Sequence, residues 1–334
     1  MMRRGLSLTT QIAMTFLGLL LITFLIGRVM PIDPVLAVVG DQASEATYRA
    51  VYQDMGLDQP LYKQFISYLA DIFSGEFGTS RVTSRPVLED IGRVFPATLE
   101  LATLATIIGV GFGIPVGVVA ATHAGRWPDY LLRVFGLFGF SIPIFWLGLM
   151  GLALFYGQLG WVSGPGRLDI YYQNLVPQVS GVLLIDSLIA GNLEVFWNAL
   201  NHLILPVSVL AYHSMAYISR MTRSFMLEQL GHEYITTARV KGLSETRVVW
   251  RHALGNIKIP MITVIALSYA TLLEGTVLTE TVFSWPGLGL YITNALLSAD
   301  MNAVLGGTIV VGVVFVGVNL LSDSLYRFVD PRAK

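Results

Sequence analysis

The chain has 334 residues, of which 54% are hydrophobic and only 13% are charged, and its formal net charge is −1. Soluble domains carry about 25% charged residues, so this composition excludes an ordinary soluble protein and predicts a membrane protein. The lack of cysteine excludes disulfides and thiolate chemistry, and basic residues spread over loops, without an interleaved aromatic patch, argue against nucleic-acid binding.

Six apolar runs are long enough to cross a hydrocarbon core about 30 Å thick, which takes about 20 helical residues. They lie near residues 12–30, 97–121, 131–157, 203–221, 259–283 and 304–326. The apolar stretch 181–190 is too short to span, and we expect a surface or re-entrant helix there. The predicted fold is therefore all-α, a polytopic membrane protein with six transmembrane helices in the lipid bilayer.

The placement of Lys and Arg predicts the orientation of these helices, because cytoplasmic loops retain positive residues. If the N-terminus is inside, 14 of the 21 basic residues fall on the cytoplasmic side. The expected parts are a cytoplasmic N-terminus with the first helix (1–30), an extracytoplasmic segment (31–95), a five-helix core (96–326) with a cytoplasmic loop at about 222–258, and a cytoplasmic tail (327–334). We expect the first helix to be an uncleaved signal anchor, because it is too long for a usual signal peptide.

The extracytoplasmic segment has helical signals of its own. It begins with the helix breakers Pro31 and Pro34, and after Pro60 apolar residues recur at helical spacing. These residues are Leu61, Phe65, Leu69 and Ile72. We expect one apolar face of this helix to rest on the membrane domain, and a turn to follow at 75–80.

Two features of the spans predict close packing and a bend. Gly109, Gly113 and Gly117 recur every four residues on one helix face, and small residues at this spacing let another helix approach closely, so we expect a packing seam rather than a ligand site. In the third span, Pro143 of the sequence Ser141-Ile142-Pro143 removes a backbone donor, which predicts a kink. Kinks serve moving helices but are equally common in static bundles. On the first of these two interpretations, Ser141 and Pro143 are candidates for the translocation pathway.

Carboxylates inside apolar spans cost free energy and are therefore functional candidates. Glu274 lies in the outer half of the fifth span. We expect it to face the water-filled pathway or a polar partner, with Asn319 of the last span as a candidate neighbour. Glu280 lies closer to the outer interface, where its side chain can reach water, so only a structural role is expected for it.

Catalytic and metal-binding motifs are missing from the chain. None of the four lysines follows a glycine, which excludes a phosphate-binding P-loop. His232-Glu233 begins like a zinc-protease helix, but Thr236 stands where the second histidine is required. We therefore expect no catalytic residue, no metal and no cofactor bound by this chain.

The polar stretch 233–255, set between two apolar spans, favours a helix, a sharp turn and a second helix. Glu233 and Lys241 fall on one face of the first helix, and Tyr234 and Ala238 form the adjacent stripe. The small side chain of Ala238 would leave room for the surface of a partner.

The turn of this stretch carries its own capping residues. Gly242 suits the position after a helix C-terminus, which needs a left-handed backbone, and it too would admit a partner. Ser244 and Glu245 suit the N-cap and the first position of the next helix. A basic loop that served only the charge rule would not need capped helices over this length, so we expect an interaction surface.

Glu233-Tyr234, Ala238, Gly242 and His252-Ala253-Leu254 resemble the signature cytoplasmic loop of bacterial ABC-importer permeases, in the variant of the dipeptide/oligopeptide branch. The likeness covers nearly the whole chain, and the long segment after the first helix is similar to the B-type subunit. Further similar segments are 56–61, 96–101, 141–148, 280–289 and 330–332. Gly255 departs from the broader signature, which has proline there, but peptide-type members vary at this position.

The resemblance implies the type I permease fold of ABC importers and a location in the bacterial inner membrane. It implies three kinds of partner: a second homologous permease subunit, two cytoplasmic ATPase subunits that bind ATP and Mg²⁺, and an extracytoplasmic solute-binding protein. In that family the loop helix docks in a groove of an ATPase. The residues implied in ATPase coupling are Glu233, Tyr234, Ala238, Lys241, Gly242 and His252. Dipeptides, oligopeptides, glutathione, nickel chelates and opines all remain open as substrates.

Two other functions are weighed against an ATP-driven importer. An ion-coupled secondary transporter would carry an ion site at broken helices, usually within inverted repeats, but carboxylates in the spans are few and no repeat is evident. An intramembrane enzyme would need a nucleophile with a base, and none is recognisable. The importer is favoured, with the ion-coupled transporter as the alternative.

Overall fold

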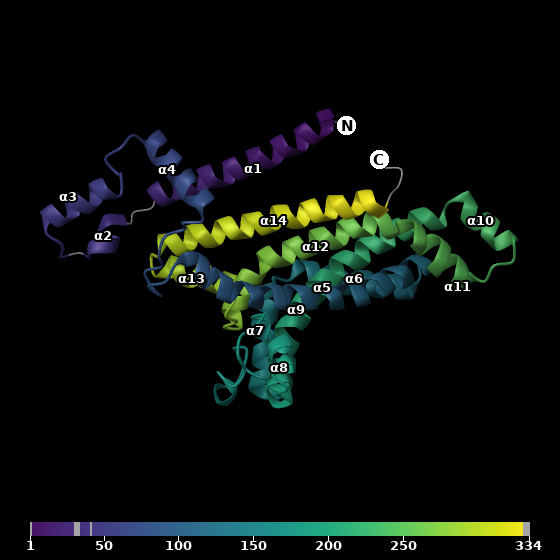
Figure 1. The fold of residues 1–334 in the computed structure, drawn as a ribbon. Helices are drawn as coiled ribbons and strands as arrows, with labels where there is room; N and C mark the ends of the chain where they lie inside the picture. The colour runs from purple at the N-terminus through teal and green to yellow at the C-terminus, as the bar shows by residue number, and fades with distance from the viewer. Residues whose placement is uncertain (1, 30–33, 41, 330–334) are drawn as a thin grey trace. The chain divides into compact units, whose positions relative to one another are not determined.

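The computed structural model describes residues 2–29, 34–40 and 42–329, so Pro31 and the predicted tail beyond 329 lie outside it. Throughout the described residues the secondary structure is helical, apart from an isolated β-bridge between Thr79 and Pro86 (Figure 1). The chain divides into two compact units. The all-α class predicted from the sequence is confirmed.

The first unit comprises Met1–Arg93 and Tyr291–Val314. Its elements are α1 (Met2–Val29), α2 (Pro34–Val39), α3 (Glu45–Asp54), α4 (Leu61–Ser74), the start of α5 (Val87–Thr122), most of α13 (Leu288–Leu297) and the first half of α14 (Met301–Val329). The helix predicted after Pro60 is confirmed as α4, and it ends at Gly75, whose φ of +83° is left-handed.

Helix α4 rests on α1 through aromatic side chains. The ring centroid of Phe24 lies 5.3 Å from that of Phe65 and 5.6 Å from that of Tyr68. The hydroxyl groups of Thr23 and Tyr68 share a hydrogen bond of 3.0 Å. The apolar face of α4 therefore packs on α1.

Asp300, just before α14, anchors the loop that follows α4. Its buried carboxylate accepts hydrogen bonds from the Ser80 hydroxyl at 2.6 Å, from the Arg81 amide at 2.7 Å and from the Val82 amide at 3.2 Å. A buried carboxylate is stable only when its oxygens are hydrogen-bonded. These bonds tie the loop after α4 to a segment more than two hundred residues later.

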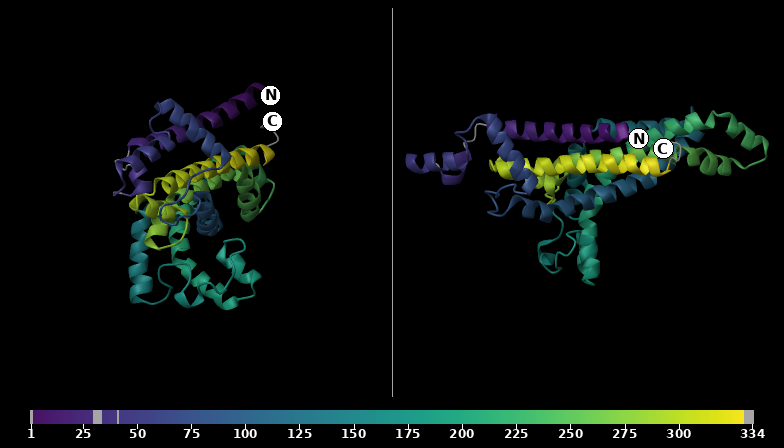
Figure 2. Two further views of the ribbon diagram at one scale, coloured as in Figure 1. Left: turned by 60° about the vertical axis from the view of Figure 1, so that its left-hand side comes forward. Right: turned by 45° about the horizontal axis from the view of Figure 1, so that its top comes forward.

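The second unit comprises Val94–Leu290 and Phe315–Lys334. Besides most of α5 and the end of α14, it contains α6 (Trp127–Ser141), α7 (Ile144–Gly151), a π-helical turn (Leu152–Gln158), a 3₁₀ turn (Ile170–Tyr172), α8 (Leu183–Ile189), α9 (Leu193–Leu230), α10 (Glu233–Val240), α11 (Glu245–Arg247), a second π-helical turn (Val248–Ala253) and α12 (Leu254–Val282). Helices α9 and α12 pack against each other, and Figure 1 labels both; Figure 2 shows the same ribbon from two other directions. The short helix expected in 181–190 is present as α8.

Within the described residues, four helices are long and apolar enough to cross a membrane. They cover Val87–Thr122, Leu193–Leu230, Glu245–Val282 and Met301–Ser322. A fifth span arises if α6 is joined to α7 and its π-helical turn, across a bend of 98°. The bend lies at Ile142 and Pro143, where Ile142 is extended because a residue before proline avoids the helical region. The kink predicted at Pro143 is therefore present, and it breaks the predicted span 131–157 in two.

The glycines of α5 form a seam with α9. A methyl group added to Gly109 would lie 2.7 Å from Ser214 Cβ, and one added to Gly117 would lie 2.5 Å from Thr222 Cβ. A methyl group added to Gly113, between them, would lie 2.9 Å from Ile218 Cγ2. Beside this seam the hydroxyl groups of Ser214 and of Ser268 in α12 share a buried hydrogen bond of 2.9 Å. Bare backbone on α5 thus lets three helices meet closely.

Candidate functional site

The loop predicted to carry an interaction surface folds as two short helices around a sharp turn. Helix α10 ends in a Schellman motif: the Gly242 amide donates to the Arg239 carbonyl at 2.9 Å, and the Leu243 amide donates to the Ala238 carbonyl at 3.3 Å. Gly242 has a φ of +81°, as its position in the sequence predicts. Ser244 then adopts the extended backbone of an N-cap before α11.

An ion pair clamps this turn from outside. Arg239 Nε lies 2.7 Å from Glu245 Oε1, and Arg239 Nη2 lies 3.3 Å from Glu245 Oε2. A fork of two hydrogen bonds fixes the relative direction of two side chains better than a single contact does. Both side chains are exposed, so we assign the pair to turn geometry rather than to stability.

One face of the loop is buried in the chain's own core. Ile235, Ala238 and Val248 are buried in a cluster with Ile218 of α9 and Ile257 of α12. The expectation that Ala238 leaves room for a partner is therefore wrong in its geometry, because this side chain contacts the chain's own core. Its small size lets α10 lie close to that core.

The opposite face of the loop is exposed and partly apolar. Val240 is 83% exposed and Trp250 is 44% exposed, although both are large apolar residues. Glu233 and Lys241 are exposed as well. Helix α10 therefore carries apolar residues on two sides: Ile235 and Ala238 face the core, and Val240 faces outward.

The remaining residues of the loop signature, Tyr234 and His252, are half-buried beneath the exposed face of the loop. Tyr234 is half-buried, its hydroxyl donates to Gln229 Oε1 at 2.9 Å, and its ring stacks against that of His232 at a centroid distance of 6.0 Å. His252 is half-buried in the π-helical turn before α12. The signature residues thus divide into exposed groups and supporting groups.

At the far end of α12, Glu280 is completely buried. Its carboxylate accepts hydrogen bonds from the Thr98 hydroxyl at 2.6 Å and from the Leu290 amide at 3.0 Å. The expectation that Glu280 reaches water at the interface is wrong, because α5 and the segment after α12 cover it. Gly287 and Gly289 lie so close to Glu280 that a methyl group on either would collide with it or its helix.

Glu274, one and a half turns earlier on α12, is exposed. Its expected neighbour Asn319 donates instead to the carbonyl of Phe315 in its own helix, at 3.1 Å. Ser141 and Pro143 are exposed where α6 gives way to α7. None of the described hydrogen bonds joins Glu274 to Asn319, and the place of these four residues in a translocation pathway stays a prediction.

A buried cluster that the sequence pattern did not predict surrounds Arg167. Its guanidinium donates to Glu100 at 2.5 Å and to the Gly181 carbonyl at 3.1 Å, and it lies 5.4 Å from the ring centroid of Trp285. Glu100 also accepts the Leu184 amide at 3.1 Å. This cluster joins α5 to the loop before α8 and to the segment after α12. The available signal was an acid at position 100 inside an apolar run.

An ion pair between Arg223 and Asp129 holds α6 against α9. Arg223 of α9 donates two hydrogen bonds, of 2.7 and 2.8 Å, to the two carboxylate oxygens of Asp129. The Gly125 amide adds a third at 3.0 Å. In the part of the chain that the structure describes, no group of three or more His, Asp or Glu side chains could hold a metal ion.

Comparison with known proteins places this arrangement in a family. The model of the "binding-protein-dependent transport system inner membrane component" matches residues 113–334, and the model of its N-terminal part matches residues 1–102. A probable D,D-dipeptide transport system permease protein of Escherichia coli is 47% identical over 315 residues, which are 94% of this chain and 92% of the relative. A di/tripeptide transport system permease protein of Pseudomonas aeruginosa is 41% identical over 321 residues, 96% of this chain and 95% of the relative.

A solved structure supports the fold. An inward-facing form of the MetNI methionine ABC transporter matches 70% of this chain and 93% of its own chain, with a TM-score of 0.52 and 16% sequence identity. Such low identity shows a common fold and nothing finer. Together with the two family models and the relatives of over 40% identity, it gives no support to an ion-coupled transporter. The chain therefore belongs to the family of inner-membrane components of binding-protein-dependent transport systems, the permease subunits of ABC importers.

Proposed function

We propose that this chain is one of two permease subunits of an ATP-driven importer of short peptides. Its relatives are named as permeases for D,D-dipeptides, for di- and tripeptides and for dipeptides. The chain spans 92–95% of the length of these relatives. The proposed partners are a second permease, two cytoplasmic ATPases that bind ATP and Mg²⁺, and an extracytoplasmic solute-binding protein.

The proposed topology has six spans, with both termini and the loop 222–258 in the cytoplasm and the segment 31–95 outside. Helix α1 is 28 residues long, about 42 Å at a rise of 1.5 Å per residue, and could cross the bilayer. The bent pair of α6 and α7 would supply another span. The Lys and Arg distribution supports the orientation.

The observation that carries the coupling role is the exposed face of the 233–255 loop on a rigid support. Val240 and Trp250 are large apolar residues exposed in an otherwise polar stretch between two apolar helices, and they supply the apolar part of the proposed interaction surface. The opposite face of α10 shares one core cluster with α9 and α12. A push on α10 would therefore move long helices as rigid bodies rather than bend a loop.

Two exposed residues of opposite charge stand at the two ends of α10. Glu233 stands in the first turn of α10, where a negative charge interacts favourably with the helix dipole. Lys241 stands at the other end of the helix, where a positive charge does the same. A complementary groove on an ATPase would pair with both charged side chains and contact Val240.

The test is uptake by vesicles that contain this chain with its partner permease, both ATPases and the solute-binding protein. We expect ATP-dependent uptake of di- or tripeptides, stimulated ATP hydrolysis, and copurification of the ATPases with this chain. Uptake driven by an ion gradient without ATP would contradict the proposal. Competition among dipeptides, D,D-dipeptides, glutathione and nickel chelates then defines the substrate.

A further inference from the structure

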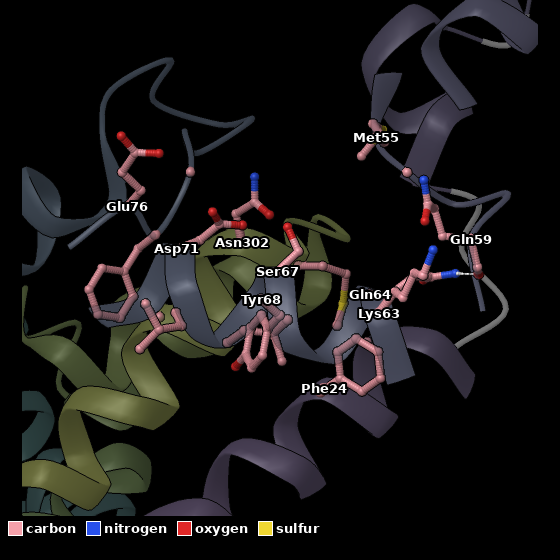
Figure 3. A pocket seen from close by; sticks show the side chains of 18 residues that line it. Phe24, Met55, Gln59, Lys63, Gln64, Ser67, Tyr68, Asp71, Glu76 and Asn302 are labelled. Atoms are coloured by element: carbon pink, nitrogen blue, oxygen red, sulfur yellow. Dashed lines mark hydrogen bonds between the residues drawn. The ribbon is translucent and has the colours of Figure 1, made fainter. Parts of the chain in front are cut away.

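The first unit contains a cleft, with both apolar and charged residues in its lining, that the proposed coupling mechanism does not use. It has a volume of about 510 Å³ and is lined by α1, the turn before α4, α4, the loop after it and the start of α14 (Figure 3). Cavities of about 300–1,000 Å³ are typical of small-molecule sites. The cleft therefore has room for a small solute.

Charges of opposite sign stand at the two ends of this cleft. Lys63 and Gln59 lie at one end, Asp71 and Asn302 lie at the other, and Ser67 lies between them (Figure 3). Along α4, residue 71 follows residue 63 by eight positions, which is about 12 Å of helix rise. The cleft is thus a trough with a positive end and a negative end.

The charges that face the cleft are not consumed by ion pairs with the described residues. Among those residues, neither Lys63 nor Asp71 takes part in an ion pair, and the same holds for Glu76 beside Asp71. Arg49, elsewhere in the same segment, does pair, with Glu45 at 2.5 Å. The charges of the cleft are therefore available to a ligand.

The wall of the cleft is already formed. Gln64 donates its side-chain amide to the carbonyls of Leu57 at 3.2 Å and of Gln59 at 2.7 Å, which fixes the turn before α4. The oxygen of that amide, Gln64 Oε1, is buried without a hydrogen-bond partner in the described structure. A buried polar atom of this kind is typical of a site that a water or a ligand completes.

We propose that this cleft binds a short peptide with free termini, its carboxylate at Lys63 and its ammonium group at Asp71 and Glu76. An extended chain spans about 3.3–3.6 Å per residue, so a tripeptide bridges the two ends and a single amino acid does not. The aromatic and aliphatic lining contributed by Phe24, Tyr68 and other residues suits the side chains between the termini. The proposal rests on the proposed function, because it concerns the same solute at a second place.

The test uses cysteine protection in this naturally cysteine-free chain, assembled with its partner permease in lipid nanodiscs without the solute-binding protein. Ser67→Cys places a thiol in the cleft, and Ser74→Cys places a control thiol on the same helix outside it. Trialanine should slow maleimide alkylation of the Ser67→Cys variant severalfold and leave that of the Ser74→Cys variant unaffected. Alanine, and trialanine blocked at both termini, should not protect.

Charge variants decide whether the two ends act as proposed. Lys63→Gln and Asp71→Asn should each raise the trialanine concentration needed for half-protection by about three- to fivefold, the scale of an exposed ion pair. The matched controls Arg49→Gln and Asp54→Asn lie in the same segment outside the cleft and should leave it unchanged. Equal protection by blocked trialanine would overturn the proposal.

The remaining outcomes separate this inference from the proposed function. Absence of protection at millimolar trialanine, in a preparation whose complete assembly imports peptides, would overturn the cleft alone. Protection by the ligand-free solute-binding protein, but not by trialanine, would also overturn it and assign the cleft to protein docking. Absence of peptide uptake by the complete assembly would instead contradict the proposed function, whatever the protection result.

Discussion

Gly242 has a backbone conformation that side chains disfavour, and its surroundings are empty. Its φ is +81°, and apart from its own backbone and its two chain neighbours no atom lies within 4 Å of where a Cβ would stand. A substitution there therefore strains the backbone without causing a collision, at a cost of about 1–3 kcal/mol. This separates the geometry of the turn from the packing of the helices.

We predict that Gly242→Val lowers peptide uptake and peptide-stimulated ATP hydrolysis together, while the protein still inserts into the membrane. Gly242→Asn should retain more activity, because asparagine tolerates the left-handed region. Gly255→Ala is the matched control: it lies on the same segment, in open space, without a positive φ. Full coupling by the Val variant in reconstituted vesicles would mean that the loop is a passive connector.

Glu274 is an acidic residue whose side chain is exposed on a membrane helix. Insertion scales put the cost of an acid at the bilayer centre at about 3 kcal/mol, so we expect this side chain to face water or a partner subunit. Glu274→Leu should impair transport or assembly, and Glu274→Gln should do so less. The readouts are uptake and the yield of assembled complex. Normal assembly and transport by the Leu variant would place Glu274 against lipid.

Glycine spacing decides the contact between α5 and α9 at the scale of elements. We predict that Gly113→Leu lowers the free energy of unfolding by about 1–3 kcal/mol, because Ile218 already occupies the space beside it. Gly111→Leu is the control, since nothing lies within 4 Å of a Cβ at that position. Thermal unfolding of the detergent-purified protein measures both. Equal destabilisation by the two variants would remove the seam as the explanation.

Asp186 fixes the loop before α8. Its carboxylate accepts hydrogen bonds from the Ser180 amide and hydroxyl, both at 2.7 Å, and from the Gly181 amide at 3.0 Å. Burial by itself raises the pKa of Asp186, but the hydrogen bonds from Ser180 and Gly181 outweigh it, and the pKa lies below its ordinary value. A carboxyl whose pKa is depressed by folding stabilises the folded state when it is ionised.

The sign of the pH dependence follows from this depressed pKa. The stabilisation from Asp186 is fully present above the ordinary carboxyl pKa, and it is lost as the pH falls through the lower pKa of the folded state. We predict that Asp186→Asn lowers the melting temperature at neutral pH and that the difference from wild type shrinks on acidification below about pH 4. A difference that stays constant down to the lowest pH tolerated by the wild type would contradict this role.

For the molecule as a whole, the proposed topology makes one prediction that labelling can check. Glu45→Cys should react with a membrane-impermeant maleimide on intact cells, because the segment 31–95 is proposed to lie outside. Thr237→Cys, on the exposed face of α10, should react only after lysis. Since the chain has no natural cysteine, each label reports a single position. The reverse pattern would invert the topology.

The sequence by itself determined the class of the molecule and the local form of its elements. Apolar runs predict membrane helices because backbone groups in lipid must be bonded within a segment. The turn at Gly242 and the bend at Pro143 were also readable from the sequence, because both depend on the backbone of one or two residues. The family could be inferred from the 233–255 loop for the same reason: its signature residues are neighbours in the chain.

Only the tertiary structure decided which polar residues are buried. Glu274 and Glu280 lie on the same helix six residues apart, yet one is exposed and the other is enclosed by Thr98 of α5 and Leu290. Ala238 packs in the core, and Arg167 donates a hydrogen bond to Glu100, 67 residues earlier in the chain. Burial depends on which neighbour covers a given face of a helix, and that neighbour comes from a distant part of the chain. The local sequence pattern cannot contain this information, because the free energy of burying a polar side chain depends on the hydrogen-bonding groups that surround it after packing.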